Sequence, residues 1–147
     1  MKPNRPLPKT VLWCIASATA SALLVLGVQT QRAAANAAPQ SDVLFSHALE
    51  DIQDREITLT SLTYPPGAGA PAHRHPAHTV VYVVSGHVES SVDDQAPITY
   101  GPGEVWYESP MQVHATFRNP SDTEPFTAIA FMLRDNTKPP TLLGTGK

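Results

Sequence analysis

The sequence predicts an all-β domain, built as a sandwich or a barrel, over residues 38–147. Short runs of β-branched and aromatic residues alternate with turns that contain Gly, Pro, Asp or Asn. From residue 41 onward no stretch shows convincing helical periodicity. Short strands separated by such turns are typical of sandwiches and barrels.

The expected strands follow one another closely along the chain. They are residues 43–49, 56–64, 79–84, 87–91, 98–100, 104–108, 113–118 and 126–134. The apolar phase of the second run shifts between Leu59 and Leu62, which predicts a bulge at that point. Residues 135–147 contain Pro139-Pro140 and two glycines and are expected to form a loose tail.

Three of the six histidines fall within six residues, at His73, His75 and His78. His73 and His75 are two positions apart, so on a strand both rings lie on one face. Pro71 and Pro76 flank them and disfavour a helix. Because neutral imidazoles are common ligands of divalent metals, the pair predicts a metal site in which these residues supply two of three ligands.

A second strand–turn unit, residues 101–119, contains His114, the best candidate for the third ligand. These two stretches resemble the two motifs of the cupin superfamily. The residues that stand at the family's intervals are Gly67, His73, His75 and Gly86 in the first motif and Gly103 and His114 in the second.

The chain also departs from the family pattern. Thr79 stands where the first motif has its glutamate ligand. In the second motif Ser109 and Met111 replace a proline and a glycine, and Asn119 comes one place late. The resemblance therefore leaves open what completes the metal site.

The resemblance implies a double-stranded β-helix, or jelly-roll, from about residue 43 to residue 133, and often a homodimer. It also implies a divalent metal ion (Fe, Mn, Ni, Zn or Cu) bound by His73, His75 and His114. Known cupins include dioxygenases, isomerases and decarboxylases as well as non-catalytic sensors and binders. The fold does not choose among these activities, nor does the ligand type choose the metal.

Two further residues are candidates for the site. His78 is a candidate fourth ligand, although strand parity places it on the face opposite to that of His73. The alternative is a partly exposed residue at an interface. Glu108, six residues before His114, is a candidate catalytic acid in the pocket; the alternative is a solvated strand end.

Both faces of the strand around Tyr82 are apolar. Thr79, Val81 and Val83 share one face, which we expect to line the interior. Val80, Tyr82 and Val84 share the other, which needs a cover from an N-terminal strand or from a second subunit. We therefore expect a homodimer.

The N-terminal segment, residues 1–37, is predicted to be a signal peptide or a membrane anchor. A basic start precedes an apolar run at residues 11–28, and residues 35–37 form an A-x-A cleavage pattern. The run would span about 27 Å as a helix, so an uncleaved anchor is the alternative. We expect an exported domain, periplasmic or extracellular, that meets a membrane only through this segment.

The composition of the exported part excludes some partners. Without residues 1–37 the chain keeps six basic and all thirteen acidic residues, a net charge near −7. Such a charge disfavours binding to nucleic acid or anionic lipid. The single cysteine, Cys14, lies in the N-terminal segment, so residues 38–147 offer no thiol nucleophile.

The sequence favours a metal-dependent enzyme on a small organic substrate. A metal or small-ligand binding module is the first alternative, and a structural protein with a decayed motif is the second.

Overall fold

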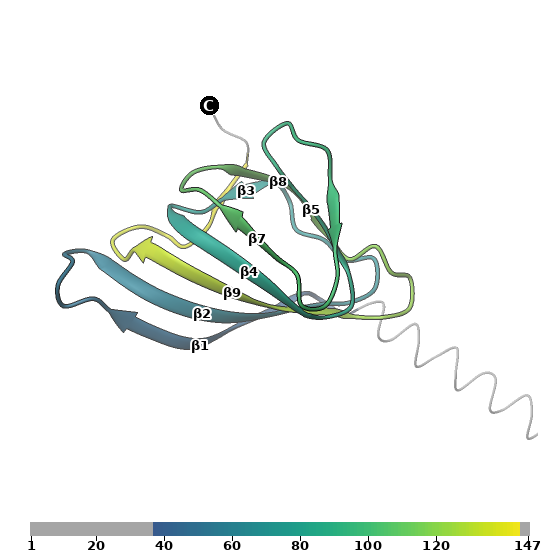
Figure 1. The fold of residues 1–147 in the computed structure, drawn as a ribbon, viewed down its shortest axis with the longest axis horizontal. Coiled ribbons are helices and arrows are strands. Elements are labelled where there is room, and N and C mark those ends of the chain that lie inside the picture. Colours follow the sequence, from purple (N-terminus) through teal and green to yellow (C-terminus); the bar gives the residue numbers. More distant parts are fainter. Residues whose placement is uncertain (1–36, 145–147) are drawn as a thin grey trace, which may run out of the picture. The chain divides into compact units, whose positions relative to one another are not determined.

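The computed structural model describes residues 37–144, and all regular secondary structure in this range is β (Figure 1). Its strands are β1 (Gln40–Ala48), β2 (Arg55–Tyr64), β3 (His73–Arg74), β4 (Ala77–Ser85), β5 (Val88–Val92), β6 (Ile98–Tyr100), β7 (Val105–Glu108), β8 (Val113–Arg118), β9 (Phe126–Asp135) and β10 (Leu142–Leu143). The predicted signal or anchor lies outside the described residues, apart from its last position. Among the residues described, no helix has the length and apolarity needed to cross a membrane.

The strands form two five-stranded antiparallel sheets. One has the order β1-β2-β9-β4-β7 and the other the order β10-β3-β8-β5-β6. From β4 to β9 the chain passes back and forth between them: β5 and β6 belong to the second sheet, β7 to the first, β8 to the second and β9 to the first (Figure 1). This winding is the double-stranded β-helix that the resemblance implied.

Strand β4 has the predicted alternation. Ala77, Thr79, Val81 and Val83 are buried, whereas the residues between them are exposed. Gly86 ends the strand with a φ of +71°, and a Cβ at this position would lie 2.5 Å from the carbonyl oxygen of Pro125. The turn after β4 therefore requires glycine.

The hydrophobic core fills only part of the space between the sheets. It consists of Val81, Val83, Val88, Trp106, Phe117, Phe126, Ala128 and Ala130. Phe126 is fully buried and meets Phe117 edge to face, with ring centroids 5.7 Å apart. On β9, Ala128 and Ala130 pair with Val83 and Val81 of β4, so small side chains lie beside larger ones on the inner face of the sheet. Towards the His73 end, polar side chains replace this core.

Two expectations about local structure were wrong. The bulge lies in β1, between Val43 and Phe45, while β2 pairs without a break with β9. Strand β2 has partners on both sides, so an extra residue there would disturb two ladders, whereas the edge strand β1 has only one to disturb. The tail is not loose either: Leu142 and Leu143 form β10, which pairs with β3.

The outer face of β4 and β7 has no cover in the described part of the chain. Its exposed apolar side chains are Val80, Tyr82, Val84, Val105 and Tyr107. Strand β1 lies beside β2 at the edge of the same sheet and does not cover this face. Of the two covers expected from the sequence, the N-terminal strand is thus excluded for residues 40–48.

Candidate metal centre and cavity

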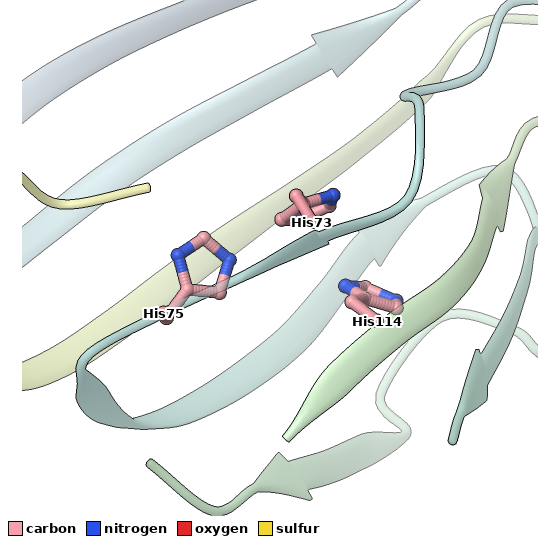
Figure 2. Close-up of side chains that lie close together, drawn as sticks. All are labelled: His73, His75 and His114. Atoms are coloured by element: carbon pink, nitrogen blue, oxygen red, sulfur yellow. The ribbon is translucent and has the colours of Figure 1, made fainter. Parts of the chain in front are cut away.

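Three histidine rings meet between the two sheets (Figure 2). His73 on β3 and His114 on β8 are directly paired, so both side chains point to the same face. Their ring centroids are 5.0 Å apart, and the ring of His75, just after β3, lies 4.8 Å from that of His73. Each ring offers a nitrogen within 4.8 Å of the other two, and all three residues are buried.

Hydrogen bonds fix the orientation of these rings. Nδ1–H of His73 donates to the carbonyl oxygen of Pro71, and Nδ1–H of His75 donates to that of Pro140, both at 2.8 Å. These bonds leave Nε2 of each ring with a free lone pair, the arrangement typical of metal-binding histidines. His114 is held from both sides: Nε2 lies 2.8 Å from Oγ of Ser90, and Nδ1 lies 3.2 Å from Oε1 of Glu108.

The surroundings keep the three rings neutral. Burial lowers the pKa of His73 and of His75 below the usual value. For His114, burial, followed by the proximity of His73 and His75, lowers the pKa to about 3. Only a neutral imidazole has a lone pair for a metal, so the cluster is ready to bind a cation at neutral pH.

Two more polar side chains from the first sheet face the histidines. Thr79 on β4 pairs with Glu108 on β7 on one side and with Met132 on β9 on the other. Trp106 Nε1 donates a 2.9 Å hydrogen bond to Glu108 Oε1. Glu108 Oε2 and Thr79 Oγ1 are buried and find no hydrogen-bond partner among the described residues. Burial also raises the pKa of Glu108. Glu108 is therefore a pocket acid by position, not a solvated strand end.

The histidines line a cavity of about 500 Å³. Its walls are mixed: Leu62, Tyr64, Val81, Phe117, Ala130 and Met132 are apolar, and Thr58, Thr60, Thr79 and Glu108 are polar. Glu56 and Arg134, paired across β2 and β9, form an ion pair that also lines the cavity. The tail residues Pro140, Thr141 and Leu143 contribute to it as well. A volume of this size suits a small organic molecule.

The structure does not bring His78 to this cluster. Its side chain lies on the exposed face of β4, where Nδ1 lies 2.6 Å from the hydroxyl oxygen of Tyr107. Strand parity already indicated this position. Sequence reasoning missed Ser90 and Pro140, which orient His114 and His75. Ser90 lies in a short strand with a glutamate and a second serine, so nothing in the sequence distinguishes it. Pro140 acts through its backbone, which carries no sequence signal at all.

The donor set fits a divalent cation. Three neutral imidazoles face one another, and a hydrogen bond at one nitrogen orients each ring. Beside them lies the buried carboxyl group of Glu108, which has one oxygen without a partner among the described residues. Nitrogen and carboxylate ligands of this kind suit Zn, Fe, Ni, Cu and Mn. Three buried histidines could therefore hold a metal ion, whose identity the ligands do not determine.

Comparisons with known proteins agree with the fold. Residues 60–132 match the family described as cupin domain. A search of curated proteins found no match. An uncharacterised conserved protein with a double-stranded β-helix domain from Klebsiella pneumoniae has 20% identity and a TM-score of 0.59, over 76% of this chain and 88% of that one.

Two enzymes are among the similar solved structures. The polyketide cyclase RemF from Streptomyces resistomycificus has 21% identity and a TM-score of 0.57, over 74% of this chain and 72% of that one. The DMSP lyase DddQ from Ruegeria pomeroyi has 24% identity and a TM-score of 0.53 over 62% of this chain, and the match spans only 45% of the lyase. These likenesses concern the fold. Together with the motifs and the family match, they show that the chain belongs to the cupin superfamily.

Proposed function

We propose that this protein binds a divalent metal ion through His73, His75 and His114 and acts on a small organic molecule held in the adjoining cavity. The observation that carries the proposal is the convergence of three buried, neutral imidazoles within 4.8 Å at the wall of a cavity of about 500 Å³. A metal bound there would polarise a carbonyl group or activate water or O₂.

The protein's own residues would position the substrate. Apolar walls from Leu62, Phe117 and Met132 exclude water around a carbon skeleton, while hydroxyl groups such as that of Thr58 offer hydrogen bonds. Dioxygenase, isomerase and decarboxylase reactions all suit such a site. A non-catalytic binding module is the second candidate, favoured by Thr79, which replaces the carboxylate of the first cupin motif.

Metal content tests the proposal. Purified protein should bind about one equivalent of a divalent metal per chain, measured by titration calorimetry and elemental analysis. His73→Ala should abolish binding without unfolding the domain, since the core consists of other residues. His87→Ala changes an exposed histidine and is the matched control. A His73→Ala protein that binds metal like the parent would refute the proposed site.

We also propose that two copies pair through the outer face of β4 and β7. Five exposed apolar side chains lie on this face, and a second copy would remove them from water. Sedimentation of the parent should give a dimer at micromolar concentration, and Tyr82→Glu should shift it to a monomer. A parent that sediments as a monomer would count against this.

Export through residues 1–37 remains a proposal, supported by the basic start, the apolar run and the A-x-A pattern. A reporter enzyme that is active only outside the cytoplasm, fused after Lys147, should be active. Activity of a cytoplasm-only reporter at the same position would contradict export.

A further inference from the structure

We propose that Glu108 is the fourth metal ligand, and that it supplies from β7 the carboxylate that the first cupin motif places at the position of Thr79. The inference rests on the proposed function, because it concerns the same metal ion. It assigns a ligand that the motif spacing does not predict.

The strand register puts Glu108 beside Thr79, which stands at the position of the motif's glutamate. Thr79 and Glu108 are direct partners on antiparallel strands, so their side chains share a face and their Cβ atoms are about 5 Å apart. Both side chains are buried, with exposed fractions of 1% and 2%. Thr79 and Glu108 both line the cavity, and Glu108 has the longer side chain.

The distance between Glu108 and His114 suits two ligands of one ion. Oε1 of Glu108 lies 3.2 Å from Nδ1 of His114. Two ligand atoms about 2.1 Å from one cation, at an angle between octahedral and tetrahedral, are about 3.0–3.4 Å apart. Nε2 of His114 lies 2.8 Å from Oγ of Ser90, so we assign Nδ1 to the ion.

The remaining hydrogen bonds support the same assignment. Trp106 donates to Oε1 and holds the carboxylate in place, whereas Oε2 has no partner among residues 37–144. A buried carboxylate oxygen without a partner is costly, and a cation bound by both oxygens of Glu108 would remove this cost. A proton shared by His114 and Glu108 is the competing explanation for their contact, and it would not require Glu108 for metal binding.

The test compares the zinc affinity of the full chain with that of three variants, by calorimetric competition with a chelator at pH 7.5. Glu108→Gln keeps the shape of the side chain and removes its charge. We expect zinc to bind at least ~10-fold more weakly, a loss comparable to that caused by replacing a residue that hydrogen-bonds to a metal ligand. Adding Thr79→Glu to Glu108→Gln returns a carboxylate to the motif position and should restore most of the affinity. Glu50→Gln, which removes an exposed carboxylate, should leave the affinity unchanged.

The outcomes separate this proposal from the proposed function. If Glu108→Gln binds zinc as tightly as the parent while His73→Ala does not bind, Glu108 is not a ligand although the histidine site stands. If the parent itself binds no divalent metal, the proposed function fails first. Circular dichroism checks that each variant is folded; if Glu108→Gln is not, Glu108→Ala takes its place, and unchanged affinity of that variant equally overturns the assignment. The visible spectrum of bound Co²⁺ should differ between the parent and Glu108→Gln, because one ligand is lost.

Discussion

The ring of His75 is held by the C-terminal tail: its Nδ1–H donates a 2.8 Å hydrogen bond to the carbonyl oxygen of Pro140, 65 residues further along the chain. Next to this bond, Leu143 pairs with His73 in the β10–β3 ladder. The tail thus supports two of the three histidines, although it contributes no metal-ligating side chain.

We predict that a chain truncated after Lys138 loses metal affinity by about 10–100-fold but stays folded. The truncation removes the acceptor of His75 and the partner strand of β3, whereas the hydrophobic core remains complete. Titration calorimetry measures the affinity, and far-UV circular dichroism checks the fold. Truncation after Gly144 keeps both contacts and is the control. Equal affinities of the two truncated chains would show that the tail does not position His75.

The stability of the metal-free protein should fall on acidification from pH 7 to pH 5. The pKa of His114 is lowered to about 3 in the folded state, so the unfolded chain binds the proton first as the pH falls through about 6.5. His114 alone should cost about 2 kcal/mol at pH 5, and His73 and His75 act in the same direction.

Glu108 acts in the opposite direction, since its pKa is raised and its contribution to stability is lost as the pH rises. Urea unfolding at several pH values measures the sum. His114→Gln should flatten the curve between pH 7 and pH 5. A parent protein equally stable at both values would contradict the burial of neutral histidines.

Met111→Gly should stabilise the protein by about 1 kcal/mol. Met111 has a φ of +66°, in the left-handed region that costs a residue with a Cβ about 1–2 kcal/mol, and glycine adopts it freely at a smaller entropic cost. This is the position where the second cupin motif has its glycine. Thermal unfolding measures the gain, with Asp94→Gly, in another exposed turn, as control. Loss of stability in Met111→Gly would mean that the methionine side chain contributes more than its backbone costs.

Asn119→Ala should destabilise the fold by about 2–4 kcal/mol. The Asn119 side chain is 1% exposed, and its amide nitrogen donates to the carbonyl oxygens of Tyr64, Pro65 and Glu124. Alanine would leave these buried acceptors without a donor. Chemical denaturation should show the loss, and Asn136→Ala, at an exposed position, should show little change. An Asn119→Ala protein as stable as the parent would mean that water replaces the amide.

The sequence predicted the parts of the fold that depend on alternation. The buried and exposed faces of β4 follow directly from the pattern around Tyr82, and the bounds of β8 agree with the expected 113–118. The pairing of His73 with His114 also agrees with the expected cluster. In β4 one face of the strand is buried, and burial leaves a period of two in the sequence. His114 was predicted from the motif spacing instead.

The contacts that the sequence did not predict depend on backbone atoms or on register. Pro140 acts through its carbonyl oxygen, and any residue could supply that group. The bulge was placed in β2 because the apolar phase shifts there, but the structure puts it in the partner strand β1. That Glu108 is buried beside Thr79 depends on how β7 aligns with β4, and the spacing within either strand says nothing about this alignment.

The pairing of Thr79 with Glu108 has a consequence for how such sites change over time. In an antiparallel sheet, two paired positions occupy neighbouring space even though 29 positions separate them in this sequence. A chemical group can therefore move from one strand to the next by two substitutions, with little displacement in three dimensions. A linear motif alone therefore misses a group that a neighbouring strand supplies, and the cross-strand partner of each motif position has to be compared with it.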